Sequence, residues 1–191
     1  MVFPMSNVQA YSLEISDNEI ILRAAFRPFN ARKMGGKIKL NLFTPPQKKL
    51  DELSCMRSSI MSISECFEKA KKIAGKDKEF HGFALITNSC ANDASPPNED
   101  GMVYIKDSRS YFLGHADLII GIKAPAEDEP LSCLDKEKFD SVRNNLYNHS
   151  VFVTQNGITV PNNVSCNKND LLANFAKDVL NILETCKEEQ V

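Results

Sequence analysis

Residues 62–87, "SISECFEKAKKIAGKDKEFHGFALIT", contain patterns for two elements of different kinds. Ser62 followed by Glu65 is a capping-box pattern, which predicts that a helix begins at this point. Gly75 is placed to end the helix, and a single apolar stripe runs along it, formed by Ile63, Cys66, Phe67, Ala70, Ile73 and Ala74. Residues 80–87 are apolar at almost every position, which predicts a central strand covered on both faces. This stretch therefore predicts a helix packed on a sheet.

Upstream of this stretch, residues 19–26 and 37–43 alternate between apolar and polar side chains, which predicts two strands. Pro28 and the pair Gly35-Gly36 lie between them and favour a flexible connection, so we expect the strands to pair in antiparallel fashion. The polar positions of this pair are basic, with Arg23, Arg27, Lys37 and Lys39. Such a basic face is either a solvated outer surface or a surface that faces an anion.

Downstream, residues 88–101 consist almost entirely of loop formers, so we expect an irregular stretch that buries little and is either a lid or an exposed insertion. A short strand at 102–106 and a longer apolar strand at 115–122 follow. Because the strands at 80–87 and 115–122 are both apolar at nearly all positions, we expect them to be neighbours in the centre of the sheet.

The last third of the chain shows a helix, a hairpin and a second helix. The helix at 135–148 is predicted by the apolar spacing of Phe139, Val142, Leu146 and Tyr147. Asn156-Gly157 between two β-branched runs predicts a hairpin over 151–160. A terminal helix is expected at 168–187, with Asn167 as its N-cap.

This order of elements is typical of the α+β class. We predict a single α+β domain over residues 1–191, with a mixed, mostly antiparallel sheet and about three packed helices. Residues 19–124 would supply the core sheet with the 62–74 helix, and residues 135–191 the helix, hairpin and terminal helix.

Composition narrows the class of protein. The chain has 191 residues, 42% hydrophobic and 25% charged, and a formal net charge of −2. That charge gives no global basic field for non-specific nucleic-acid binding, although a local patch could still bind one. There is no secretory signal pattern and no apolar run of the ~18–20 residues that span a bilayer. Six cysteines without a C-x-x-C pair are typical of reduced thiols rather than zinc ligands. We expect a cytoplasmic protein with no membrane segment; no pattern indicates a cofactor, a metal or an oligomeric state.

One polar pair stands out at the start of an apolar strand. His115 and Asp117 are two residues apart, so on a strand their side chains share one face. The carboxylate could orient the imidazole for general acid–base catalysis, or both could bind a metal with a third ligand from elsewhere. Alternatively, the pair satisfies its own hydrogen bonds at the beginning of the strand.

A second polar cluster lies in residues 53–59, "LSCMRSS", ahead of the capped helix. Ser54 and Arg57, with Ser58 and Ser59, could form an anion-binding corner near a helix N-terminus. The alternative is that the serines shape a turn and Arg57 pairs with a surface carboxylate.

Four segments, "RAAFRP", "ELSCMRSS", "FHGFALIT" and "GHADLIIG", resemble in order and spacing a family of small bacterial proteins of unassigned function. The resemblance covers roughly residues 19–121. It implies that the polar residues of interest are Arg23, Ser54, Arg57, His115 and Asp117. It implies no mechanism, because the family has no established activity.

Two hypotheses follow. In the first, the protein is a small bacterial enzyme, a hydrolase for instance, acting on a nucleotide or nucleic acid. His115 would be the acid or base, Asp117 would orient it, and Arg57, Ser54 and Arg23 would bind the substrate. In the second, it is a non-catalytic, partner-binding subunit of a bacterial multi-gene system of the defence or toxin–antitoxin type. Arg57 and His115 in one pocket would favour the enzyme; opposite faces would favour the subunit.

Overall fold

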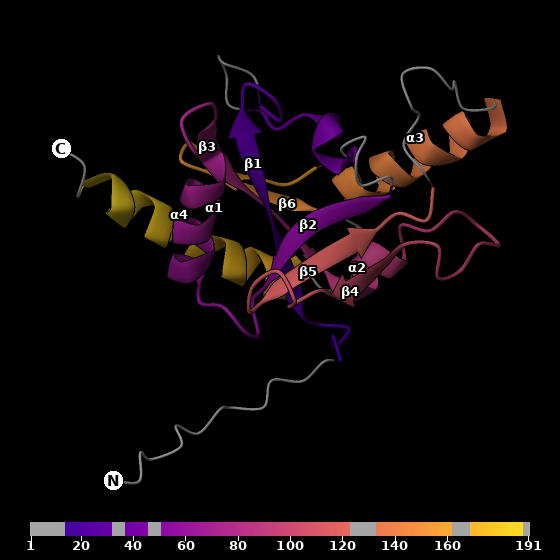
Figure 1. The fold of residues 1–191 in the computed structure, drawn as a ribbon, viewed down its shortest axis with the longest axis horizontal. Helices are drawn as coiled ribbons and strands as arrows, with labels where there is room; N and C mark the ends of the chain where they lie inside the picture. Colours follow the sequence, from indigo (N-terminus) through magenta and orange to yellow (C-terminus); the bar gives the residue numbers. More distant parts are fainter. Residues whose placement is uncertain (1–13, 32–36, 46–50, 123–132, 162–168, 189–191) are drawn as a thin grey trace, which may run out of the picture.

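A seven-stranded antiparallel sheet organises the chain. Figure 1 shows its strands with helices packed around them. The computed structural model describes residues 14–31, 37–45, 51–122, 133–161 and 169–188. The strand order is β4-β5-β2-β1-β3-β6-β7. The strands are β1 (Ile20–Arg27), β2 (Glu52–Arg57), β3 (Glu79–Thr87), β4 (Tyr104–Asp107), β5 (His115–Ile119), β6 (Val151–Thr154) and β7 (Gly157–Thr159). The helices are η1 (Leu40–Phe43), α1 (Ile63–Ala74), α2 (Asn88–Asn92), α3 (Cys133–Asn148) and α4 (Asn169–Glu188). The predicted single α+β domain is confirmed.

Helices cover both faces of the sheet and enclose two apolar cores. On one face, α1 and α4 pack against the strands, with Phe67, Phe83 and Val179 in the core. On the other face, η1, α2 and α3 cover a core that includes Leu118 and Phe139. Strands β1, β2, β3 and β5 are therefore buried from both sides, which explains why their sequences are apolar on both faces.

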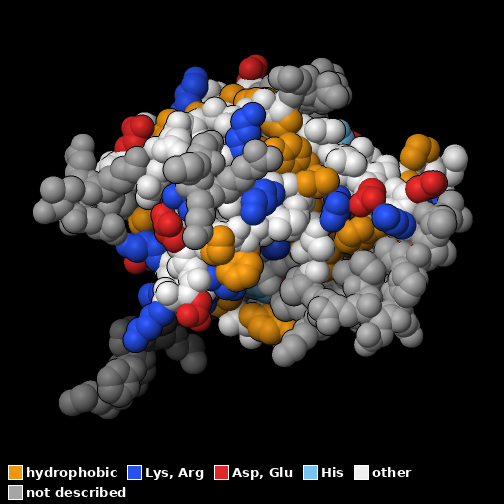
Figure 2. Space-filling view, turned by 90° about the horizontal axis from the view of Figure 1, so that it is seen from above, with side chains coloured by type: hydrophobic (Ala, Val, Ile, Leu, Met, Phe, Trp, Pro, Cys, Tyr) orange, Lys and Arg blue, Asp and Glu red, His pale blue; other side chains and the backbone are white. Residues whose placement is uncertain are grey.

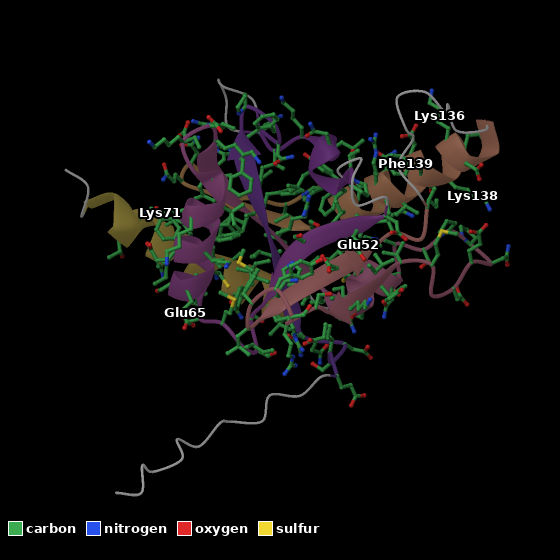
Figure 3. The ribbon with its side chains drawn as sticks, in the orientation of Figure 1. Glu52, Glu65, Lys71, Lys136, Lys138 and Phe139 are labelled. Carbon is green, nitrogen blue, oxygen red and sulfur yellow. The ribbon has the colours of Figure 1, made fainter. Side chains whose placement is uncertain are left out.

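The α1 helix forms as its sequence predicts. The Ser62 side chain accepts a hydrogen bond from the Glu65 backbone N–H, and the Glu65 carboxylate accepts one from the Ser62 backbone N–H, which completes the capping box. Glu65 lies at the first turn of α1 in Figure 3. Gly75 ends the helix with a φ of 60°. Ile73 is the exception in the apolar stripe, because it is exposed at the surface.

The prediction of a strand at 37–43 is wrong. Residues 40–43 form the short 3₁₀ helix η1, and Ile38 makes one isolated bridge to Ala31. The edge of β1 beyond Leu22 is open. Arg23 Nε donates to the Leu42 carbonyl there, so the segment packs beside this edge as a 3₁₀ helix instead of pairing with β1 as a strand. Consecutive Leu42 and Phe43 are both buried, which a half-exposed strand could not achieve.

The expected pairing of the two central strands is also wrong. Neither β3 nor β5 is at an edge, but β1 and β2 lie between them. Every interior strand of a covered sheet is apolar, so this pattern cannot specify which two are adjacent. The sequence predicts no strand at β2, because the polar residues Ser54 and Arg57 interrupt its apolar pattern.

Residues 88–101 are more ordered than predicted. The first five form α2, whose N-terminus is capped by the Thr87 hydroxyl accepting from the Cys90 N–H. Cys90, Ala91 and Ala94 are buried in the core on the α3 side of the sheet. The small side chains that suggested a loop instead allow a short helix to pack closely against β4.

The C-terminal elements agree with the sequence analysis. Helix α3 buries Phe139, Val142 and Leu146, and β6 and β7 form the predicted hairpin. Its two turn residues are Gln155 and Asn156, one position earlier than the predicted Asn156-Gly157, and Gly157 pairs with Thr154. The expected cap of the last helix, residue 167, lies outside the described residues. Within the described ranges, no helix is both long and apolar enough to span a bilayer.

Candidate ligand-binding site

The sheet opens between β1 and β2, and the opening creates the candidate site. The two strands are paired only where Ile21 and Leu22 face Arg57 and Met56. Beyond Leu22, β1 remains paired with β3, whereas β2 remains paired with β5. The strands therefore separate, and the next residue of β1, Arg23, extends into the gap.

Arg23 is held in this gap by neutral carbonyl groups. Its Nε donates to the Leu42 carbonyl of η1 at 2.7 Å, and its Nη1 donates to the Ser54 carbonyl of β2 at 2.8 Å. Burial lowers the pKa of the Arg23 guanidinium from its ordinary value, while the neighbouring Cys55 and Asp117 oppose this. Among the described residues, no carboxylate lies within ion-pair distance of this guanidinium. Arg23 thus carries a partly desolvated positive charge that carbonyl dipoles orient but do not neutralise.

Arg23 lines a hollow of about 590 Å³, a size typical of small-ligand pockets. Two lysines share the walls with it: Lys69 on α1, and Lys78 just before β3. None of the described residues lining the hollow is acidic. The apolar walls are largely aromatic, with Phe26, Phe29, Tyr111 and Phe112. We call this space the main hollow.

The two lysines stand above aromatic rings. Lys69 Nζ is 4.0 Å from the centre of the Phe112 ring. Lys78 Nζ is 5.5 Å from the Phe29 ring and 5.8 Å from the Phe26 ring. Cation–π attraction favours these positions without cancelling the charge. The main hollow therefore presents positive charge and aromatic surface together.

His115 forms part of the wall, and Asp117 lies behind it. Both side chains are almost completely buried. The ring Nδ1 of His115 is 3.0 Å from the Ser108 carbonyl, which can only accept, so Nδ1 carries the proton. Nε2 lies 3.7 Å from Asp117 Oδ1. The rings of Tyr111 and Phe112 pack on the imidazole at centroid distances of 5.0 and 4.9 Å.

Ser54 and Cys55 of β2 also line the main hollow. Ser54 is exposed there and stands opposite Asp117 in the β2–β5 register. Burial raises the pKa of the Cys55 thiol to about 11, so this thiol is protonated at neutral pH and is a poor nucleophile. The chemistry available in the hollow is that of cations, hydroxyl and imidazole.

Arg57 lies elsewhere, in an internal ion-pair network. Its Nε and Nη2 donate to the two Glu19 carboxylate oxygens, both at 2.8 Å, and its Nη1 donates to Asp107. The Ser59 hydroxyl donates to Glu19 at 2.6 Å. Hydrogen bonds from Arg109, then from Arg57, lower the pKa of Asp107 to about 2. Two carboxylates thus neutralise Arg57, which is 1% exposed.

The structure brings together three of the five candidate residues directly. Arg23, Ser54 and His115 line the main hollow, and Asp117 contacts it through His115. Arg57 is on the other face of the sheet, because it follows Met56, which faces the same side as His115. The sequence analysis missed Lys69, Lys78 and the aromatic residues. One available signal was the placement of Lys69 and Ile73 one turn apart on α1.

The described part of the chain contains no group of three side chains suited to holding a metal ion. Comparison of the chain with protein-family models, with curated protein sequences and with solved structures finds no match in any of the three. The class of protein is therefore defined by its fold and its site alone: an α+β domain with a cationic, aromatic-lined hollow where its sheet opens.

Proposed function

We propose that this protein binds a small phosphate-bearing ligand with an aromatic ring, of which a nucleotide is the simplest class, in the main hollow. The observation that carries the proposal is Arg23, a partly desolvated guanidinium with carbonyl partners and no described carboxylate beside it. A charge in such a position is stabilised by an anion that enters the hollow.

The remaining lining supports the same ligand class. Lys69 and Lys78 add two ammonium groups that a phosphate can contact, while Phe26, Phe29 and Tyr111 offer faces on which a planar base can stack. Asn30 also lines the hollow, and its Oδ1 already accepts from the Phe26 N–H at 3.3 Å. Its amide NH₂ would then be the group that donates to a ligand. Hydrogen-bond donors dominate, which favours a ligand rich in acceptors.

Acid–base catalysis is assigned to His115 within this proposal. Because Nδ1 is bonded to the Ser108 carbonyl, only Nε2 can exchange a proton with a ligand. Asp117 Oδ1 lies 3.7 Å from Nε2 and would position the ring for proton transfer. The proposed enzyme would thus use His115 as acid or base, Asp117 to position it and Arg23 to hold the anion.

Isothermal titration of the wild-type protein with AMP, adenosine and inorganic phosphate tests the binding proposal. We expect AMP to bind at least tenfold more tightly than either fragment, because only AMP can use the cations and the rings together. The other three ribonucleoside monophosphates give the base preference. Equal weak binding of all ligands would contradict the proposal.

The His115→Asn variant tests the catalytic role. Asparagine keeps a donor near the Ser108 carbonyl but has no group that titrates, so we expect the free energy of unfolding to fall by no more than about 1–2 kcal/mol. The kcat for release of phosphate from a nucleotide, or for cleavage of a phosphodiester, should fall about a hundredfold or more, with KM nearly unchanged. The Tyr104→Phe variant, at an exposed position outside the main hollow, serves as a control. A wild-type protein that binds nucleotide but forms no product would rule out catalysis and leave binding intact.

A second candidate function, a partner-binding subunit, is favoured by one observation. Arg57 and His115 lie on opposite faces of the sheet, and both are held by internal partners. In that case the exposed residues Tyr111, Leu113 and Phe29 would contact a partner protein. No nucleotide binding, together with loss of a stable complex on Tyr111→Ser substitution, would support this function.

A further inference from the structure

We infer that the ligand is a single-stranded nucleic acid, bound by a track that continues from the main hollow along the end of β1. This inference rests on the proposed function and extends it from one nucleotide to a strand. The track is the main hollow plus a second, adjoining hollow of about 390 Å³. Lys78 lines both.

The second hollow has a different character from the first. It is lined by Arg27, Pro28, Lys76, Asp77, Lys78 and Glu79, without an aromatic ring among these described residues. Glu79 is paired with Arg27 at 3.4 Å. Lys76 is exposed and forms no ion pair with a described residue. A polar, cationic hollow of this kind fits a phosphate and sugar rather than a base.

The two hollows together concentrate positively charged side chains, although the chain as a whole is slightly acidic. Arg23, Lys69, Lys78, Lys76 and Arg27 supply five positive side chains against two acidic ones, whereas the whole chain has a net charge of −2. Figure 2 shows lysine and arginine side chains beside exposed hydrophobic ones in the middle of the face seen from above. Local concentration of positive charge is the electrostatic footprint expected for a bound polyanion.

Aromatic rings next to this track favour a single strand over a duplex. Phe29 and Tyr111 are 54% and 69% exposed, so their rings are accessible to ligands. Bases of a single strand can stack on such rings, while bases inside a duplex are already stacked on one another. The main hollow would bind one base and its phosphate, and Lys76 would contact the phosphate of the next nucleotide.

Binding of AMP, of eight-nucleotide oligoadenylate as RNA and as DNA, and of an eight-base-pair duplex tests the inference by fluorescence anisotropy and calorimetry. We expect the single strands to bind at least tenfold more tightly than AMP and the duplex to bind no better than AMP. The RNA and DNA arms identify which strand is preferred.

The Lys76→Glu variant locates the second contact. It should weaken binding of the oligomer about tenfold and reduce the slope of log affinity against log salt concentration by about 1, while AMP binding stays unchanged. Lys136→Glu makes the same charge change on α3, far from α1 in Figure 3, and should leave both affinities unchanged.

The outcomes separate the two proposals. Oligomers that bind no more tightly than AMP, or a Lys76→Glu variant that behaves like Lys136→Glu, would overturn the strand inference and leave nucleotide binding in place. Equal binding of the duplex would overturn the preference for a single strand. Failure of AMP and of every oligomer to bind would overturn the proposed function and the inference with it.

Discussion

Replacing Arg57 by methionine is expected to lower the free energy of unfolding by about 3–5 kcal/mol, because it leaves the buried Glu19 carboxylate without its cation and removes one of the two arginines that pair with Asp107. Arg57 is 1% exposed and pairs with Glu19, itself 7% exposed, through two hydrogen bonds of 2.8 Å. It also binds Asp107 of β4. Methionine fills a similar volume but supplies no donor. Urea denaturation monitored by circular dichroism measures the loss.

Arg109→Met is the matched control for this prediction. Arg109 pairs with the same Asp107, but its side chain is 28% exposed and water can replace it. We expect a loss of about 1 kcal/mol or less in the free energy of unfolding.

Adding Glu19→Gln to Arg57→Met should recover part of the stability by removing the uncompensated charge. A stable Arg57→Met protein that no longer binds nucleotide would instead restore Arg57 to the binding site.

The Arg57 network also shows where sequence reasoning stops. An arginine and two serines ahead of a capped helix suggested an anion site, yet the anion that Arg57 binds is Glu19, 38 residues earlier in the chain. No local pattern connects these two residues. Strand β2 is hard to recognise for the same reason. Ser54 and Arg57 interrupt its apolar pattern, and their neighbours in the folded sheet are distant in the sequence.

Local signals were sufficient where the stabilising contacts are local. Helix α1 begins and ends where its capping box and Gly75 place it, since both act within one turn. The 37–43 segment failed for the opposite reason. Its alternation is real, but burial of both Leu42 and Phe43 and the hydrogen bond from Arg23 to the Leu42 carbonyl favour a 3₁₀ helix beside β1, and neither interaction can be inferred from the local sequence.

Three of the candidate site residues were identifiable because each is a polar residue within an apolar strand. The free-energy cost of burying such a residue must be offset by a hydrogen-bond partner or justified by a function. Arg23, Ser54 and His115 meet that description and line one hollow. Lys69 and Lys78 do not, since a lysine on an amphipathic helix or beside a turn is normally solvated. Only the folded geometry places them above the rings.

Arg23→Met is expected to reduce nucleotide affinity about a hundredfold, on the order of 3 kcal/mol, because it removes the partly desolvated guanidinium from the wall of the main hollow. Stability should respond differently. The substitution gives up two hydrogen bonds to carbonyls but also relieves the desolvation of an arginine without a described carboxylate partner. We expect the free energy of unfolding to change by no more than about 1 kcal/mol in either direction. Calorimetric titration with AMP and urea denaturation of the same preparation measure both quantities.

The contrast between the two arginines is what makes this prediction decisive. Arg57 pairs with carboxylates inside the fold, so its replacement should lower the free energy of unfolding. Arg23 donates to backbone carbonyls and pairs with no described carboxylate, so its replacement should lower the affinity for the nucleotide. Arg23→Lys keeps the positive charge but lacks the planar guanidinium that can donate two parallel hydrogen bonds. We therefore expect an intermediate loss of about tenfold in AMP affinity. Arg109→Met, outside both hollows, should leave AMP affinity unchanged. If Arg23→Met unfolds the protein as Arg57→Met does, or binds AMP as the wild type does, Arg23 is a structural residue and the main hollow is not an anion site.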